Sequence, residues 1–390
     1  MDPREPEGPP GQLDRLRHRL AQQHGEKLLA ETTAGASLRP RRDAASVLAF
    51  AISLAVHSVT VALVVAGILL VVLGWGSALP VLGAVLLGFG WALRPRFESL
   101  TDDDPVLHRA DAPELFGLID RVAEVTGTTG VHAVVVTADA NASVAVYGMR
   151  QRRKLTLGLG LWEITTPQQR IALLGHELGH YANGDTRHGL IIANALRSLT
   201  TWWYLLSRIP QPTTLAHIAF NAVYLLPRCI VRGVLALLDH LTLRATQRGE
   251  YLADVLAARA GSTEAAVGLM DRLLVADSAE SVLLREANSA QVKRPRSGTR
   301  EDAWRGLWER LADDMDSIPE SEYERRRRRG ALRGHSVDST HPPTHLRRAR
   351  LLAVAPEVAA VRADADRQAV LDDELATARE RLARRILGGL

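Results

Sequence analysis

The feature that most limits the possible folds is a long segment without charge. The chain has no Asp, Glu, Lys or Arg from Ala44 to Leu73, and this exceeds the roughly 20 apolar residues that span the hydrocarbon core of a bilayer. A turn at residues 74–77 carries Trp75, and the chain stays apolar up to Leu93. We therefore predict a transmembrane helical hairpin over residues 44–93. The alternative is a helical hairpin buried in the core of a soluble protein.

Arginines on both sides of this segment predict its orientation. They cluster at Arg41 and Arg42 before it and at Arg94 and Arg96 after it, and none lies in the turn. Because positive residues favour the cytoplasmic side, both outer ends are expected in the cytoplasm. The sequence thus predicts a multi-pass protein of the cell membrane, in contact with the lipid bilayer. Residues 1–43 are expected to form a disordered N-terminus and a short amphipathic helix.

A second feature is the pentapeptide His176-Glu177-Leu178-Gly179-His180. Two histidines four apart share one face of a helix and can bind one zinc ion, and Glu177 is then placed to act as a general base on water. Thr166-Pro167 upstream is typical of a helix N-terminus. The alternative is a helix with two surface histidines and a solvated glutamate. The apolar residues 171–174 argue against it, because unpaired polar groups are costly to bury.

A candidate third ligand lies further along the chain. Arg248-Gly249-Glu250 is expected to open a new helix, on which Glu250 and Asp254 share a face. Two histidines and one glutamate with an open fourth position make a catalytic zinc site, and Asp254 can support a histidine ring from behind. Taken alone, this pair also fits a charged stripe on a solvated helix.

The remaining pattern predicts an α+β fold that is mainly α, with a small β-sheet. Residues 111–127 show helical periodicity, residues 131–136 a buried strand, and residues 141–147 and 154–161 a hairpin. An edge strand at 141–147 could pair with an extended peptide. A plain structural hairpin fits the same residues equally well.

Two further apolar segments, at 190–206 and 215–238, are interrupted by arginine and asparagine. A mid-span arginine costs about 2.5–3.5 kcal/mol on insertion scales. We therefore expect residues 189–243 to form membrane-associated helices, which lie against the membrane or pack beside the hairpin. The alternative is that these helices are true transmembrane spans.

Composition excludes some classes of protein. The net charge of +4 is too small and too evenly mixed for a nucleic-acid-binding protein. The single cysteine, Cys229, excludes an intrachain disulfide. Residues 292–301 are expected to form a polar loop, and the run Arg325–Arg329 suits a solvated helix or anionic lipid headgroups. The C-terminal helix expected at 356–390 could dock on the domain or extend away from it.

Several motifs occur together in a fixed order: His176–His180, then Asn183 and Asp185, then Glu250 and Asp254, then Ser339-Thr340-His341-Pro342 with Arg347. The set resembles the HtpX-like family of membrane zinc metalloproteases, which is related to the CAAX prenyl endopeptidases. The resemblance covers about residues 110–352, and the apolar hairpin before it also fits.

The resemblance implies a zincin-like metalloprotease domain at residues 97–355, and the orientation predicted from the arginines places this domain on the cytoplasmic side. It implies one Zn²⁺ per chain and a role for each motif residue. The implied zinc ligands are His176, His180 and Glu250, with Glu177 as the general base. Asp254, Asp185 and Arg347 are implied to support the ligands, and His341 to donate to the oxyanion. Asn141, Ala142 and Ser143 are implied to begin a substrate-binding edge strand.

There are two departures from the family pattern. Thr246-Gln247 stand where Ser-Arg is common, and residues 189–243 are more polar than the third and fourth spans of the family. The predicted function is a membrane-anchored zinc endopeptidase that acts on polypeptides, chiefly membrane or misfolded proteins. The alternatives are a catalytically inactive membrane adaptor and a CAAX-type prenyl-peptide protease.

Overall fold

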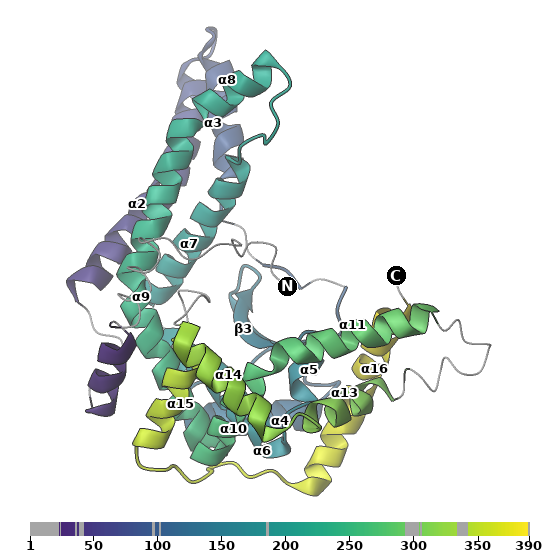
Figure 1. Ribbon diagram of the computed structural model, residues 1–390. Coiled ribbons are helices and arrows are strands. Elements are labelled where there is room, and N and C mark those ends of the chain that lie inside the picture. Colours follow the sequence, from purple (N-terminus) through teal and green to yellow (C-terminus); the bar gives the residue numbers. More distant parts are fainter. Residues whose placement is uncertain are drawn as a thin grey trace. The chain divides into compact units, whose positions relative to one another are not determined.

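The computed structural model describes residues 23, 25–35, 37–38, 43–95, 98–100, 103–184, 187–292, 304, 306–333 and 342–388 (Figure 1). The chain divides into two compact units. The helical unit comprises residues 40–97 and 184–246, and the mixed unit comprises residues 1–39, 98–183 and 247–390. Most of the amphipathic helix expected within residues 1–43 lies outside the described residues, which are helical at 25–33.

The helical unit contains α2 (Ala44–Leu73), α3 (Leu79–Ala92), α7 (Arg187–Leu205), α8 (Leu215–Val223) and the first part of α9 (Leu225–Gly261). Asp43 begins α2 by accepting a hydrogen bond from the N–H of Ser46 at 2.8 Å. Glycines let α2 and α3 approach closely, since a Cβ on Gly67 would lie 2.9 Å from the carbonyl oxygen of Gly83. A small core of Ala49, Val56, Leu199 and Val231 joins α2, α7 and α9.

One helix of the described chain is long and apolar enough by itself to cross a membrane, and this is α2. The bent pair of α8 and α9, with a 40° change in direction, passes the same test together. Helix α3 packs against α2 but has 14 residues, which is about 21 Å of helix against a hydrocarbon core of about 30 Å. A transmembrane hairpin is therefore not shown, and the second span stays a prediction.

The mixed unit is built on a four-stranded sheet in the order β1-β2-β4-β3. The strands are β1 (Val106–Leu107), β2 (Ala133–Thr137), β3 (Ala142–Tyr147) and β4 (Arg152–Gly158). Every residue of β2 is buried, and β2 pairs in parallel with β4. The β3–β4 pair is antiparallel, with Ala145 opposite Lys154. This leaves β3 at one edge of the described sheet.

The remaining helices of the mixed unit surround this sheet. They are α4 (Pro113–Thr126), α5 (Leu159–Trp162), α6 (Pro167–Gly184), α10 (Thr263–Leu274), α11 (Ala276–Val292), α13 (Leu307–Asp316), α14 (Glu320–Arg333), α15 (Thr344–Ala353) and α16 (Ala365–Gly388). The described chain is thus mostly helical with a small mixed sheet, as predicted. Most of the polar loop predicted at 292–301 lies outside the described residues.

Helix α9 corrects one prediction. Arg248 does not open a new helix, because α9 runs without a break from Leu225 to Gly261. Between Leu238 and Arg248 the sequence has no glycine or proline that would end a helix. The division between the two units therefore falls inside one helix, between Thr246 and Gln247.

The C-terminal helix α16 is docked on the mixed unit. Its Leu371, Leu375 and Leu382 are buried in the main core. The carboxylate of Glu374 accepts hydrogen bonds from the N–H groups of Glu114 and Leu115, at 2.7 and 2.9 Å, and so caps the first turn of α4. Of the two arrangements open from the sequence, the structure has the docked one.

Candidate metal centre

The motif helix α6 starts where the sequence predicts. Thr166 and Gln169 form a reciprocal cap, in which each side chain accepts a hydrogen bond from the backbone N–H of the other residue. Glycines on α6 then allow close contact with the second half of α9. A Cβ on Gly179 would lie 3.0 Å from the Cα of Ala253, and one on Gly175 would lie 2.8 Å from the Cβ of Ala260.

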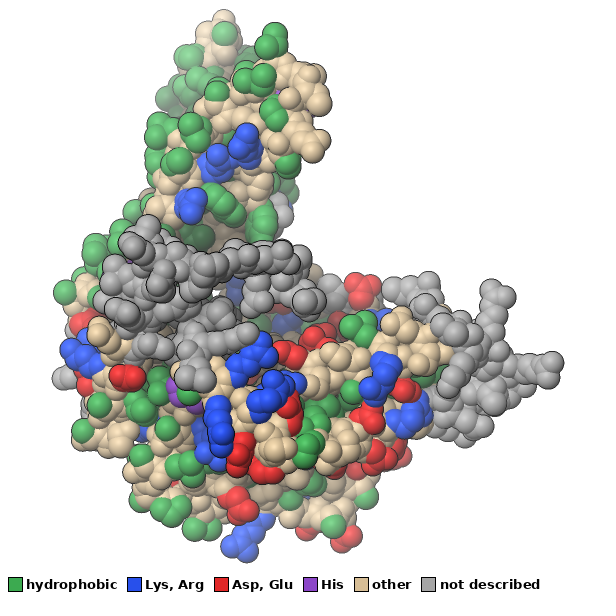
Figure 2. Space-filling view, viewed as in Figure 1, with side chains coloured by type: hydrophobic (Ala, Val, Ile, Leu, Met, Phe, Trp, Pro, Cys, Tyr) green, Lys and Arg blue, Asp and Glu red, His purple; other side chains and the backbone are tan. Residues whose placement is uncertain are grey.

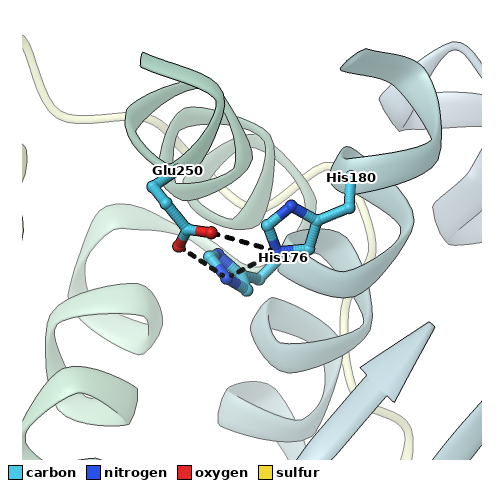
Figure 3. A group of neighbouring side chains, drawn as sticks. All are labelled: His176, His180 and Glu250. Atoms are coloured by element: carbon cyan, nitrogen blue, oxygen red, sulfur yellow. Dashed lines mark hydrogen bonds and ion pairs between the residues drawn. The ribbon is translucent and has the colours of Figure 1, made fainter. Parts of the chain in front are cut away.

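This close contact brings the three predicted ligands together (Figure 3). His176 and His180 extend from α6 and Glu250 extends from α9, and their ligand atoms all lie within 4.8 Å of one another. The two Nε2 atoms are 3.2 Å apart. Oε2 of Glu250 lies 3.6 Å from Nε2 of His176, and Oε1 of Glu250 lies 3.7 Å from Nε2 of His180.

These separations fit a tetrahedral zinc site. Zinc binds histidine nitrogen and carboxylate oxygen at about 2.0–2.2 Å, so neighbouring ligand atoms of a tetrahedron lie about 3.3–3.6 Å apart. The two imidazole nitrogens, 3.2 Å apart, agree with this. The 3.6 and 3.7 Å separations belong to different oxygens of Glu250, Oε2 and Oε1, and with one ligand atom from each residue all three atoms lie within 4.8 Å of one another. Two imidazoles and one carboxylate are also the donor set of catalytic zinc sites with an open fourth position. The three side chains thus form a possible zinc site.

A buried ion pair supports His176 from behind. Nδ1 of His176 lies 3.1 Å from Oδ1 of Asp254, which holds Nε2 of the ring toward the other ligands. Arg347 on α15 donates from Nη2 and Nε to the two oxygens of Asp254, at 2.6 and 2.9 Å. Its Nη1 also lies 3.6 Å from Glu250. One guanidinium therefore contacts both carboxylates.

The charges of this pair are fixed by their surroundings. Burial alone would raise the pKa of Asp254, but the charge and hydrogen bonds of Arg347 outweigh burial and hold it well below its usual value. Burial likewise opposes the charge of Arg347, and the charge of Asp254 still raises its pKa above the usual value. Both groups are therefore ionised at neutral pH, and Asp254 is an acceptor for the ring N–H of His176.

Glu177 and the predicted substrate-binding residues share one cavity with the histidines. This cavity has a volume of about 990 Å³. Glu177 is buried and lies on its wall with His176 and His180. Asn141, Ala142 and Ser143, at the start of the edge strand β3, line the same cavity. The structure thus brings the predicted base, the predicted ligands and the predicted strand to one place, while their roles stay predictions.

Two predicted site residues cannot be placed. Asp185 and His341 lie outside the described residues. The described part of the chain after His341 does reach the cavity, where Pro342, Thr344 and His345 line its wall.

Sequence reasoning missed two contributors to the site. Tyr181, directly after the motif, has its hydroxyl 2.6 Å from the carbonyl oxygen of Ala145 and 2.8 Å from that of Lys154, so it joins α6 to both strands of the hairpin. Burial raises the pKa of Tyr181 well above its usual value, so it stays a neutral donor. The arginine run of α14 also lines the cavity, and no local sequence signal indicated this.

Comparison with known proteins agrees with this geometry. No curated protein and no solved structure matches the chain. The family model for peptidase family M48 matches residues 110–355, which is more than half of the chain and includes all the residues of the possible zinc site. Its members include HtpX and CAAX-protease-like proteins, so the resemblance seen in the sequence is confirmed. The chain belongs to peptidase family M48, a family of zinc metalloproteases.

Proposed function

We propose that this protein is a membrane-anchored, zinc-dependent endopeptidase that hydrolyses peptide bonds of membrane or misfolded proteins. Membership of family M48 supports the reaction class. The observation that carries the proposal is the convergence of His176, His180 and Glu250 from two helices, beside Glu177, on a cavity bordered by an edge strand. An inactive adaptor would have no need of the complete set.

Each residue has a separate task in this proposal. His176, His180 and Glu250 would hold a zinc ion, which would supply Lewis acidity and lower the pKa of water to about 7. Glu177 accepts a proton from the attacking water and later transfers it to the leaving amine. Asp254, kept ionised by Arg347, fixes the ring of His176 so that Nε2 is available as a ligand. His341 remains the predicted donor to the oxyanion of the tetrahedral intermediate.

The substrate is proposed to bind as an added strand along β3. This strand is paired on one side, with β4, and its first residues line the cavity that contains Glu177. Main-chain hydrogen bonds to an edge strand hold a peptide extended irrespective of its sequence. Tyr181 fixes β3 relative to the motif helix through the carbonyl oxygen of Ala145. The scissile bond would then lie at a set distance from Glu177.

The membrane anchor is proposed to begin with α2. This helix is strongly apolar, and large side chains such as Val61 and Val72 remain more than 60% exposed. Exposed apolar surface of this extent along a helix that can span a bilayer suits contact with lipid. We further propose the multi-pass topology with the mixed unit in the cytoplasm. Arginines on the cavity wall favour a polar peptide over a prenylated one.

Replacing the proposed base separates an enzyme from an adaptor. The full chain is purified in detergent with zinc, and both zinc content and cleavage of an unstructured model protein are measured. The Glu177→Gln protein is expected to keep about one zinc per chain and to lose about 10²–10⁴-fold in rate. The matched Glu250→Gln protein is expected to lose both zinc and cleavage. Wild-type protein with less than about half a zinc per chain, or a Glu177→Gln protein as active as wild type, would refute the proposal.

A further inference from the structure

We infer that the arginines of α14, chiefly Arg329 with Arg325, form a carboxylate-binding wall of the active-site cavity that selects peptides with an acidic side chain near the scissile bond. The inference rests on the proposed function, because it names the substrate class of that same cavity. It concerns a run of five arginines, Arg325–Arg329, for which the sequence suggested a solvated helix or a lipid contact.

The position of the run in the fold is the first step. Helix α14 packs with α10 and α15, and positive side chains gather over α14 with acidic side chains among them (Figures 1 and 2). Arg325, Arg326, Arg327 and Arg329 all line the cavity that holds His176 and Glu177. Four of the five arginines therefore line the cavity that contains the proposed reaction site.

Two of these four are occupied in holding the helix. Arg326 donates to the carbonyl oxygen of Leu274 at 2.7 Å and to the hydroxyl of Ser278 at 2.8 Å. Arg327 donates to the carboxylate of Asp271 at 2.9 Å. These contacts fix α14 against α10 and α11, and they leave little capacity for a ligand.

Arg329 offers its whole guanidinium group to the cavity, and Arg325 offers part of one. Arg329 has no ion pair or hydrogen bond to any residue that the structure describes, and it is exposed. Arg325 donates from Nε and Nη2 to the two oxygens of Glu322 of its own helix, at 2.7 Å each, so its Nη1 is left for a ligand, and its side chain is 59% exposed. The two are four positions apart, so they lie on one face about one helical turn from each other. A carboxylate between them could accept hydrogen bonds from both.

The chemistry of the wall selects for acid. A guanidinium binds a carboxylate through paired N–H donors, which gives geometric as well as electrostatic preference. Leu269 and Leu273 of α10 line the same cavity and offer an apolar surface to the rest of the peptide. The preference comes from Arg329, because the other lining arginines, Arg325, Arg326, Arg327 and Arg347, already pair with the carboxylates of Glu322, Asp271 and Asp254. The wall therefore attracts acidic peptides and repels basic ones.

The fifth arginine provides a matched control. Arg328 carries the same charge on the same helix, but it pairs with Glu324 at 3.3 Å, its side chain is 78% exposed, and it does not line the cavity. Charge reversal at 328 changes the net charge of the protein as much as charge reversal at 329. The two variants differ in whether the changed group faces the cavity.

The experiment uses full-length, zinc-loaded protein in non-ionic detergent and sets of fluorogenic peptides that differ at one position as Glu, Gln or Lys. For wild type we expect kcat/KM for the best Glu peptide to exceed that of its Gln partner by about three- to fivefold. Arg329→Glu is expected to abolish this preference and to favour the Lys peptide, while Arg328→Glu keeps the wild-type ratio. An unchanged ratio in Arg329→Glu, or an equal change in both variants, overturns the inference.

A binding arm separates this inference from the proposed function. Affinities of the same peptides are measured by fluorescence anisotropy on Glu177→Gln protein, with and without Arg329→Glu. A lower Kd for the Glu peptide that disappears with Arg329→Glu supports the carboxylate-binding wall. If wild type cleaves no peptide but this preference in Kd is present, the proposed endopeptidase function fails and the wall stands. Equal Kd values for Glu and Gln peptides overturn the wall. The same affinities are also measured in phosphatidylserine nanodiscs. If Arg328→Glu and Arg329→Glu change Kd only in these nanodiscs, and equally for all peptides, the wall is overturned, because the arginine run would then bind lipid headgroups.

Discussion

Replacing Arg347 by methionine tests the buried network behind the possible zinc site. The guanidinium donates to both oxygens of Asp254, at 2.6 and 2.9 Å, and lies 3.6 Å from Glu250. Asp254 and Glu250 are only 1% and 3% exposed. Methionine keeps most of the apolar stem and removes the charge. Two carboxylates would then remain buried without the cation that lies between them.

The structure sets the expected magnitudes. Removing one partner of a buried ion pair costs about 3–5 kcal/mol, because the other charge stays buried. We therefore expect the free energy of unfolding of the zinc-free chain to fall by about that amount. Since Asp254 orients His176, we also expect the Kd for zinc to rise about 10–100-fold, the usual effect of losing a group that supports a metal ligand.

Two assays are used. The free energy of unfolding is measured by urea titration in detergent with tryptophan fluorescence as the signal, and the Kd for zinc is measured by competition with a chromogenic chelator. Arg348→Met is the control, because the neighbouring Arg348 pairs with Asp271 at 3.2 Å at a more exposed site and is expected to cost less than about 1 kcal/mol. In the double variant Arg347→Met/Asp254→Asn the loss should be smaller than the sum of the two single losses, because the buried charge is also removed. Additive losses, or an Arg347→Met protein that behaves as Arg348→Met does, would refute the reasoning.

Four further outcomes follow from the structure. Glu374→Ala should lower the free energy of unfolding, measured by urea titration, by about 1–3 kcal/mol, because α4 loses its cap. Asp373→Ala, at the exposed neighbouring position, is the control and should change this free energy by less than about 0.5 kcal/mol. Tyr181→Phe should raise KM for peptides more than it lowers kcat, because the hydroxyl positions β3; equal KM values would contradict this. Gly179→Val should abolish zinc retention, since its Cβ would lie 3.0 Å from the facing backbone of α9; a variant with full zinc content would contradict the close packing. Chelation should abolish cleavage and leave the far-ultraviolet circular dichroism unchanged; helix loss would show that the ion builds the fold.

The β3–β4 hairpin, the buried strand β2 and the motif helix were predictable from local pattern, whereas strand β1 and the parallel pairing of β2 with β4 were not. Alternation predicted the β3–β4 hairpin, and the turn between these strands uses Gly148 at φ +68°, a conformation that glycine adopts without strain. The start of α6 followed from Thr166 and Pro167, because a capping side chain and proline both favour the first turn. These features depend on neighbours within a few residues along the chain.

Other features depend on distant neighbours, and the sequence could not decide them. Helix α9 passes from one unit to the other without any residue that ends a helix. The helix start predicted at Arg248 is therefore wrong. The docking of α16 depends on Glu374 meeting the first turn of α4, more than 250 positions away. The wall formed by Arg325 and Arg329 is likewise set by tertiary packing of α14.

The fold itself brings together two ligands that lie far apart in the sequence. His180 and Glu250 are separated by the whole segment 184–246 of the helical unit, and closing a loop of that length costs conformational entropy that a metal alone would have to offset. Here the glycine contacts pack α6 against α9, and the contact of His176 with Asp254 joins the same two helices. The closure is therefore part of folding, and zinc binding needs little further ordering. Such preorganisation leaves the binding energy of the metal available for affinity.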